Sequence, residues 1–351
     1  MFLSGRTAEG TLCWGSTAHG CCATTDGLSG NKTVDFGFSI PGRGPLATRE
    51  GIKAFATRGE ELGFACLGVP DHIVVPRNID SRYPYSSTGT FPGAASGDCV
   101  EQLTIMAYLA GITTEVKLLA SVMVVPHRSA VFAAKALASI DLLSNGRVIA
   151  GVGSGWMAEE FKAIGAPPFS DRGRVTDEYL EAFKVLWAHE QPIYQGNYVS
   201  FEDVTFLPRP VQQPHIPIWV GGESKAALRR TVTHGDAWYP VGSNPQFPLN
   251  TTARYSEALE RLYRVADEHN RDPATIKLAY WAHWPNDGEP IVLSDGQHHL
   301  FTGSPDQIVD DIGVFRELGV QHLFFNFQRE DMASSVRSME EFVDRILSRV
   351  G

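Results

Sequence analysis

The feature that most constrains this chain is a regular alternation of short apolar runs with longer amphipathic stretches, beginning at Val34. Short, continuously apolar runs bounded by Gly, Pro or polar residues are typical of strands buried on both faces of a sheet. We expect such strands at residues 34–40, 64–70, 117–125, 147–152, 216–220, 236–241, 276–281 and 321–327. Strands of this kind run parallel and are joined by helices.

The stretches between these strands have the spacing of helices with one buried face. We expect helices at residues 46–62, 100–112, 129–143, 174–189, 224–234, 252–269 and 305–318, and a closing helix after Ser334. Residues 193–206 are expected to form a hairpin that turns at Gly196-Asn197. Eight strand–helix units, without a dinucleotide-binding GxGxxG motif after the first strand, favour a closed (β/α)8 TIM barrel with insertions over an open, doubly wound α/β sheet.

The domain organisation follows from where this pattern begins. Residues 34–351 are expected to form one barrel domain, because single barrels with insertions commonly reach this length. Residues 1–33 are rich in Gly, Ser, Thr and Cys and lack periodicity, so we expect a poorly ordered N-terminal extension. Three of the five cysteines lie there without CxxC spacing, which predicts no functional metal site and favours a reduced, cytoplasmic setting.

Charge and motif content exclude several classes of function. The formal net charge of −10 argues against nucleic-acid binding, which needs a basic face. The sequence has no apolar run of about 18 residues, so we expect no membrane span. The eleven histidines form neither HxH nor HExxH and no GxSxG motif is present, so metal-dependent and serine-nucleophile hydrolysis have little support. The expected partner is a small organic molecule.

The second expected strand delivers Asp71 and His72 to the end of the barrel where such folds place their active sites. A histidine in that position is able to exchange a proton near neutral pH. The alternative is a histidine that is hydrogen-bonded within the following loop. The residues alone leave both interpretations open.

Two glycine-containing strand ends are candidate ligand sites. Residues 221–224 (GGES) follow the fifth strand and open a helix, where free amide groups attract anions. The alternative is an ordinary turn with Ser224 as the helix N-cap. Glu223 favours that alternative, because a carboxylate beside a phosphate is unfavourable unless it points away. Residues 151–156 (GVGSGW) either admit a flat ligand or pack tightly at a strand-to-helix corner.

A long polar stretch at residues 76–99 separates the second strand from the next helix. A loop of that length in a compact domain is usually functional or mobile. We expect its aromatic residues Tyr83, Tyr85 and Phe91 to cover an organic substrate. The alternative is a mobile surface loop.

Five segments together resemble the luciferase-like oxidoreductases, particularly the branch that uses the deazaflavin coenzyme F420. They are VPDHIVVP (69–76), LLASVMVVPHR (118–128), LASIDLLSNGRVIAGVGSGWMAEEF (137–161), PVQQPHIPIWVGGESKAALRR (210–230) and GDAWYP (235–240). Each is modest alone, but they follow one another in the expected order within a stretch from about residue 34 to 240, which is more than half of the chain. The resemblance implies a (β/α)8 barrel whose mouth holds the isoalloxazine-type ring.

The resemblance also implies which residues meet the cofactor. Ser121-Val122 matches a non-prolyl cis peptide that bulges against the ring, and Ser154-Gly155 matches a ring-contacting turn. Gly221, Gly222 and Ser224 match the segment that receives the cofactor phosphate. We place Asp71 and Glu223 in the same cofactor site.

The activity that the resemblance implies is F420-dependent hydride transfer to or from an unknown organic substrate. His72 matches a histidine near the reactive carbon, where it would exchange a proton with the substrate. Trp156 stands where a sugar-phosphate dehydrogenase of this family has a catalytic glutamate, so we expect Trp156 to be a pocket wall. The alternatives are a monooxygenase using reduced FMN from a separate reductase, and a flavin-binding barrel without turnover. We also expect a homodimer.

Overall fold

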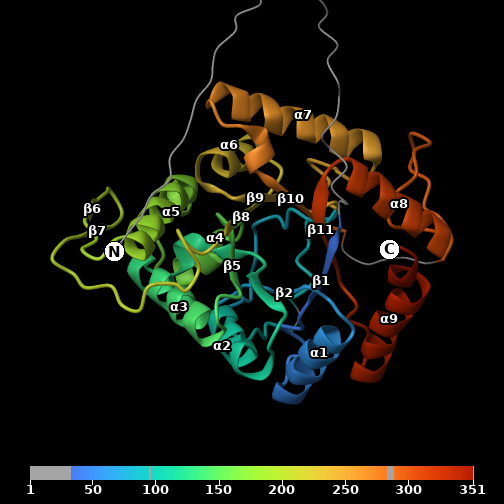
Figure 1. The fold of residues 1–351 in the computed structure, drawn as a ribbon, viewed down its shortest axis with the longest axis horizontal. Coiled ribbons are helices and arrows are strands. Elements are labelled where there is room, and N and C mark those ends of the chain that lie inside the picture. The colour runs from blue at the N-terminus through green and yellow to red at the C-terminus, as the bar shows by residue number, and fades with distance from the viewer. Residues whose placement is uncertain (1–32, 95, 283–287, 351) are drawn as a thin grey trace, which may run out of the picture. The chain divides into compact units, whose positions relative to one another are not determined.

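A computed structural model describes residues 33–94, 96–282 and 288–350 (Figure 1). The expected N-terminal extension lies outside the described residues apart from Thr33, and so do Cys13, Cys21 and Cys22. The barrel domain can therefore be described by itself. By their contacts, the described residues from Thr33 onward form one compact unit.

Eight parallel strands within the described residues close into a barrel, as the alternation of apolar runs predicts. They are β1 (Asp35–Ser39), β2 (Cys66–Val69), β3 (Lys117–Ala120), β5 (Val148–Gly153), β8 (Ile218–Gly221), β9 (Ala237–Tyr239), β10 (Lys277–Trp281) and β11 (Val320–Phe325). They are hydrogen-bonded in the ring order β1-β2-β3-β5-β8-β9-β10-β11, and the β1–β11 and β3–β5 pairings leave no open edge. Closure removes the unpaired backbone groups that an edge strand would present.

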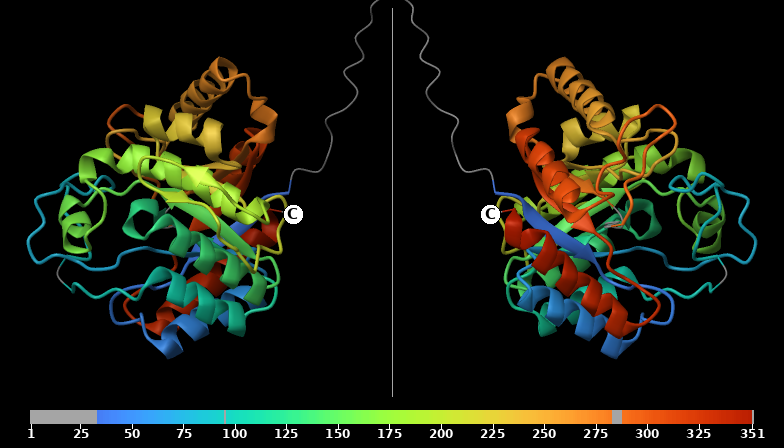
Figure 2. Two further views of the ribbon diagram at one scale, coloured as in Figure 1. Left: turned by 90° about the vertical axis from the view of Figure 1, so that its left-hand side faces the viewer. Right: turned by 90° about the vertical axis from the view of Figure 1, so that its right-hand side faces the viewer.

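Helices surround this barrel on the outside (Figures 1 and 2). The long ones are α1 (Arg49–Glu61), α2 (Gln102–Ile112), α3 (Ala130–Leu143), α5 (Arg172–Ala188), α6 (Lys225–His234), α7 (Thr252–Glu268), α8 (Pro305–Glu317) and α9 (Met332–Arg345). The first and last of them lie side by side, joined by an ion pair of 2.7 Å between Arg58 and Glu340. None of the helices in the described ranges is both long and apolar enough to cross a bilayer.

Three local features differ from the sequence expectation. The strand expected at 117–125 is interrupted by a cis peptide between Ser121 and Val122, and only β4 (Met123–Val124) continues it. The hairpin expected at 193–206 is reduced to β6 (Tyr194–Gln195) and β7 (Ser200–Phe201). The short helix α4 (Ala158–Ala163) was not predicted, because six residues are too few to show helical periodicity.

The reduced hairpin has a physical cause in the neighbouring helix. The Glu178 carboxylate of α5 accepts hydrogen bonds of 2.6–2.9 Å from the backbone N–H groups of Asn197, Tyr198 and Val199. A side chain from α5 therefore satisfies the turn. The strands beyond it pair over only two residues each.

The interior of the barrel is filled with side chains, so ligands are confined to its ends. Seven of the eight strands contribute side chains to a buried cluster inside the barrel, separate from the core between the strands and the surrounding helices. Its members are Cys66, Leu119, Ile149, Trp219, Ala237, Tyr239, Ala279 and Phe324. Trp219 and Tyr239 both contact the ring of Phe324. The remaining strand, β1, contributes Gly37, where an added Cβ would lie 2.3 Å from that ring.

Gly151 on β5 gives a test of this packing. A Cβ at this position would lie 2.0 Å from the carbonyl oxygen of Ala120 and 2.8 Å from Leu119 Cδ1. Because neither β3 nor its core side chain has room to move, Gly151→Ala is expected to lower the free energy of unfolding by about 3 kcal/mol. Urea denaturation at neutral pH measures the change.

Gly111 in α2 is the matched control for that measurement. An added Cβ there meets no atom within 4 Å, so Gly111→Ala is expected to be neutral or stabilising by up to about 1 kcal/mol. Equal stability of the Gly151→Ala and Gly111→Ala variants would contradict the close approach of β3 and β5.

Candidate active site

The C-terminal ends of the strands surround a cavity of about 850 Å³. This volume is within the range of small-molecule and cofactor sites. The cavity is lined by all but one of the residues that the sequence assigns to the site: Asp71, His72, Tyr83, Tyr85, Phe91, Ser121, Val122, Ser154, Gly155, Trp156, Gly221, Gly222 and Ser224. Glu223 is the exception. Motifs that are far apart in the chain thus meet in one site.

The floor of the cavity is built around Val122. The Ser121–Val122 peptide is cis, as the resemblance implies, and the Val122 side chain packs between two strand-end glycines. An added Cβ would lie 2.9 Å from Val122 at Gly153 and 3.0 Å from it at Gly221. These glycines therefore make room for Val122. Ser121 is held from below by a 3.1 Å hydrogen bond between its hydroxyl group and that of Tyr239.

The glycines of the GVGSGW segment serve packing more than ligand access. Gly151 faces the backbone of β3, and Gly155 has a positive φ of 81° with Phe161 and Val124 2.7 Å from its absent Cβ. Both alternatives for this segment therefore hold in part, because Gly155 and Ser154 also line the cavity.

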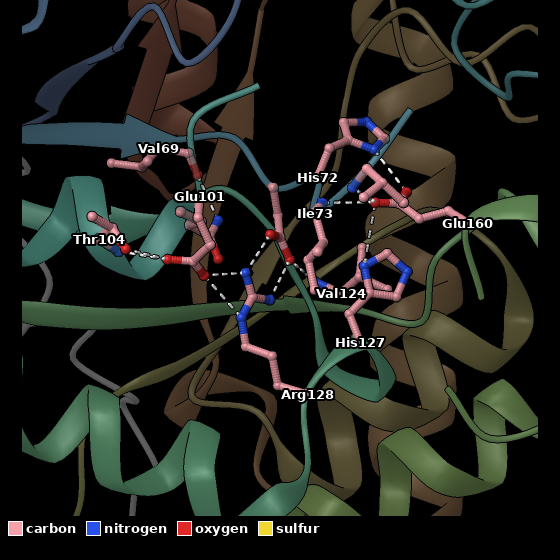
Figure 3. Close-up of polar contacts among 12 residues, drawn as sticks. Val69, His72, Ile73, Glu101, Thr104, Val124, His127, Arg128 and Glu160 are labelled. Atoms are coloured by element: carbon pink, nitrogen blue, oxygen red, sulfur yellow. Dashed lines mark hydrogen bonds and ion pairs between the residues drawn. The ribbon is translucent and has the colours of Figure 1, made fainter. Parts of the chain in front are cut away.

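His72 is bound to Glu160, a residue that sequence reasoning missed (Figure 3). The distance from His72 Nδ1 to Glu160 Oε2 is 2.8 Å. The second carboxylate oxygen, Oε1, accepts the backbone N–H groups of Ile73 and Val74 at 2.7 and 3.2 Å. Glu160 therefore fixes both the imidazole and the loop that carries it.

The charge of Glu160 decides which nitrogen of His72 carries the proton. Burial alone would raise the pKa of Glu160, but the hydrogen bond and charge of His72, the charge of His127 and the Ile73 N–H group bring that pKa below its usual value. An ionised carboxylate only accepts hydrogen bonds, so Nδ1 of His72 is the protonated nitrogen. In the neutral ring Nε2 is then left as a proton acceptor beside the cavity.

His127 is the second histidine at this carboxylate. It lines the cavity, and its Nδ1 lies 3.9 Å from Glu160 Oε1. Its ring nitrogens are buried and neither has a hydrogen-bond partner among the described residues. Burial lowers the pKa of His127, against the opposing effect of the nearby Glu160 charge.

Asp71 lines the cavity, and its carboxylate is held by neighbouring groups of the protein. Its side chain has no exposed surface and accepts two hydrogen bonds of 2.8–2.9 Å from the Arg128 guanidinium, plus the N–H group of Val124 at 2.8 Å. Arg128 also binds Glu101, the N-cap residue of α2 (Figure 3). Asp71 therefore anchors the strand-2 end next to His72.

The Gly221–Ser224 segment has the geometry of an anion site, with one correction. Ser224 caps α6 by accepting the N–H group of Ala227 at 3.2 Å, so the N-cap interpretation is confirmed. The N–H groups of Lys225 and Ala226, in the first turn of α6, have no acceptor within the helix. Gly222 has a φ of 103°, which only glycine adopts readily, and its carbonyl accepts the indole N–H group of Trp238 at 2.9 Å.

Glu223 does not line the cavity. Its carboxylate accepts hydrogen bonds from the Val241 N–H group at 2.7 Å and from Asn244 Nδ2 at 2.6 Å. A carboxylate beside a bound anion would be unfavourable. The Glu223 side chain instead points away from the place where an anion would sit at this turn. Burial raises the pKa of Glu223 in this position.

Two arginines that no sequence motif indicated also line the cavity. Arg172 donates to the carbonyl oxygens of Gly155 and Phe169 at 3.2 and 3.0 Å. Arg230 binds Asp177 at 2.6 Å and the carbonyl of Gly173 at 3.1 Å. Burial and the nearby positive charge of Arg230 lower the pKa of Arg172. Arg172 has no carboxylate partner within the described residues to offset these two effects. Arg172 therefore brings an unpaired positive charge to the cavity, beside Arg230, whose charge is paired with Asp177.

The loop at 76–99 places its aromatic side chains where they were expected. Phe91 lies 4.9 Å from the His72 ring and 5.4 Å from that of Trp156, measured between ring centroids. Tyr83 contacts both Phe91 and Trp156, and Tyr85 packs on Tyr83. Trp156 is thus a pocket wall, as its position in the chain predicts.

The fold and this site define a member of a known enzyme class. Residues 34–284 match the luciferase-like monooxygenase family, so the chain belongs to that family. Its members include flavin- and F420-dependent oxidoreductases and monooxygenases.

Particular relatives differ in their cofactors. A Mycobacterium tuberculosis protein of uncharacterised function is 28% identical over 276 residues, covering 75% of this chain and 90% of its own. The FMNH2-dependent dimethylsulfone monooxygenase of Pseudomonas putida is 36% identical over 165 residues, covering 46% of this chain and 45% of its own.

Two solved structures have the same fold at low sequence identity. An F420-dependent secondary alcohol dehydrogenase has a TM-score of 0.68 at 16% identity, with 91% of this chain and 99% of that one covered. The monooxygenase RslO1 of Streptomyces bottropensis has a TM-score of 0.67 at 20% identity, with 91% and 100% covered.

The tautomer of His72 provides a test of the Glu160 contact. In Glu160→Gln the amide oxygen has to stay on the Ile73 and Val74 N–H groups, which turns the amide NH2 group toward His72 Nδ1. The proton is therefore expected to move from Nδ1 to Nε2. Long-range 1H–15N spectra above pH 7.5 report the tautomer, with His72 assigned by its own substitution. Glu159→Gln is the control, because the Glu159 carboxylate does not contact His72 and accepts the backbone N–H groups of Asp80 and Ser81 instead.

The stability of the same variant is expected to depend on pH. Because the pKa of Glu160 in the folded protein is below the unfolded value of 4.5, its ionised form stabilises the fold above that pH. This contribution is lost as the pH falls through the lower folded-state pKa. The difference in unfolding free energy between wild type and Glu160→Gln should therefore shrink from about pH 5 to pH 3. A pH-independent difference in urea denaturation would count against an ionised Glu160.

Proposed function

We propose that this protein is an F420-dependent oxidoreductase that transfers a hydride between the deazaflavin and an organic substrate. The observation that carries this proposal is the positive centre of Arg172 and Arg230 next to the glycine turn and free amides at the start of α6. A phosphate-bearing cofactor with a long anionic tail needs basic groups beyond that turn. Both arginines line the cavity.

The residues present fit such a cofactor at each of its parts. The Val122 surface, flanked by Gly153 and Gly221, offers a smooth floor without bulky strand-end side chains. The phosphate would be held by the Gly222–Ser224 turn and Arg172. When bound, the deazaflavin supplies a carbon that gives or accepts a hydride.

His72 is the residue that we assign to proton transfer. With Nδ1 bound to Glu160, its Nε2 accepts a proton from a substrate hydroxyl group, or returns one after protonation. Glu160 and Asp71 act as positioning residues, through the imidazole and through the strand-2 end. The aromatic wall of Tyr83, Phe91 and Trp156 excludes water from the substrate side.

The second candidate is an FMN-dependent monooxygenase. The similarity to the dimethylsulfone monooxygenase over nearly half of this chain favours it, since that relative uses FMNH2. The same anion centre would then hold the FMN phosphate, and a separate reductase would supply the reduced flavin. A flavin-binding barrel without turnover would have no use for the His72–Glu160 pair. The homodimer and the cytoplasmic location stay predictions.

Cofactor titration separates the two enzymatic candidates. F420 is expected to bind the full chain more tightly than FMN, and Arg172→Gln is expected to weaken F420 binding by about tenfold. The matched control is Arg174→Gln, because Arg174 is exposed and bound to Asp171. Fluorescence of each cofactor measures the binding. Tight FMN binding without F420 binding would replace the proposal by the monooxygenase.

Turnover of the His72→Ala variant tests the proton-transfer assignment. Alcohols and carbonyl compounds that change the deazaflavin absorbance with the wild-type protein serve as substrates. We expect His72→Ala to lower kcat by about 10²–10⁴-fold. F420 affinity should remain within about twofold of wild type, because His72 lies away from the anion centre. Unchanged kcat in this variant would remove His72 from the reaction.

A further inference from the structure

Two positive centres lie on opposite sides of the barrel mouth. In the ring order of the strands, β5 and β8 are diametrically opposite β1 and β11. Arg172 follows β5, and Arg230 lies on α6 after β8. Arg43 follows β1 and Arg329 follows β11, and both of these also line the cavity. An anion bound at Arg172 and Arg230 therefore does not neutralise the positive charges of Arg43 and Arg329 on the opposite side.

Arg43 is held in place without an acidic partner. Its guanidinium carbon lies 4.8 Å from the centroid of the Phe91 ring. Its Nη1 would be 3.0 Å from a Cβ at Gly93, so the glycine leaves the space that the guanidinium occupies. It forms no ion pair within 4 Å with a carboxylate of the described residues. The nearby acid, Asp98, accepts the Gly44 N–H group at 2.9 Å, and the charge of Arg43 contributes to lowering the pKa of Asp98.

Arg329 is the second cation on this side. Its backbone N–H group donates to Ser335 Oγ at 2.8 Å, which fixes the start of the loop before α9. Its guanidinium donates to the carbonyl of Gln328 at 3.1 Å and has no ion-pair partner in the described part of the chain. The neighbouring Asp331 is engaged as the N-cap of α9, accepting the Ser334 N–H group at 2.7 Å.

Phe91 connects this centre to the reacting group. The Phe91 ring contacts the His72 ring, at 4.9 Å between centroids, and it also contacts the guanidinium group of Arg43. With Tyr83 and Trp156, which also line the cavity, Phe91 gives this side an aromatic wall that suits an aromatic or apolar ligand.

We propose that Arg43, assisted by Arg329, binds a carboxylate, sulfonate or phosphate group of the substrate, so that the substrate is an organic anion with an aromatic or apolar body. This inference rests on the proposed function, because it assigns the Arg172 centre to the cofactor. Arginine suits the role, since its planar fork binds such groups in a bidentate manner and stacks on an aromatic ring. In a chain of net charge −10, two unpaired arginines at one cavity wall indicate a specific ligand.

A pair of matched probes tests the proposal. 1-Naphthylacetate and 1-naphthylacetamide share an aromatic body and differ by one negative charge. Isothermal titration calorimetry on the full chain, with and without F420, is expected to show naphthylacetate binding at least about tenfold more tightly. Arg43→Gln should abolish this preference while leaving the amide affinity unchanged, and Arg43→Lys should retain most of it. Arg49→Gln is the control for charge, because Arg49 is exposed on α1.

The possible outcomes distinguish this inference from the proposed function. Equal binding of the two probes, no binding of naphthylacetate at millimolar concentration, or a preference that survives Arg43→Gln would each overturn the anion site. None of these results touches the cofactor assignment, which the Arg172→Gln titration tests separately. If Arg43→Gln weakened F420 binding instead, the second centre would belong to the cofactor tail and the inference would fail.

Discussion

The packing of the barrel interior is the constraint on which the rest of this structure depends. Trp219, Tyr239 and Phe324 fill the space between the strands, and Gly37 is small because Phe324 lies over it. A filled barrel has no internal site, so polar chemistry is confined to the strand ends and the loops after them. Each of the eight strands, at its end or in the segment after it, then contributes residues to one cavity. Residues almost three hundred positions apart, such as Arg43 and Arg329, line the same cavity because β1, which precedes Arg43, pairs with β11, which precedes Arg329.

Within that cavity, the Glu160 carboxylate organises the reacting side. One oxygen holds His72, and the other holds the backbone that carries it. The loop and the imidazole therefore keep a fixed relation, which preorganises the proton acceptor before any ligand enters. The ion pair of Asp71 with Arg128 likewise fixes the backbone at the residue before His72. The charges at this end are paired with one another, whereas Arg172 and Arg43 form no ion pair with a carboxylate of the described residues.

The fold was largely predictable from the sequence, because buried parallel strands leave a strong apolar signal. The strand expected at 147–152 became Val148–Gly153, and the helix expected at 252–269 became Thr252–Glu268. The break at Ser121–Val122 was invisible to periodicity, since KLLASVMVV reads as one continuous apolar run. Only the resemblance to a family indicated the cis peptide there. The hairpin was predicted too long because its stabilisation comes from Glu178, a contact outside the segment itself.

The site was predictable where a strand end carried an informative residue, and not elsewhere. His72 and the GGES turn follow strands directly, so the barrel rule found them. Glu160 sits on a six-residue helix, and Arg172 opens a helix beyond it, so neither position follows from strand counting. Their signal was chemical: a histidine at a strand end needs an orienting acceptor, and a phosphate turn needs a cation.

The same reasoning explains why Glu223 and Ser224 behave differently although they are adjacent. A residue at a strand-to-helix turn faces either the cavity or the protein, and Gly222 with its positive φ sets which. The turn directs the Glu223 carboxylate to Val241 and Asn244 and leaves Ser224 at the cavity. The negative charge that seemed to oppose a phosphate is thereby removed from the anion site. The GGES motif, in which an acidic residue lies next to a possible anion site, is therefore consistent once the direction of the Glu223 side chain is known.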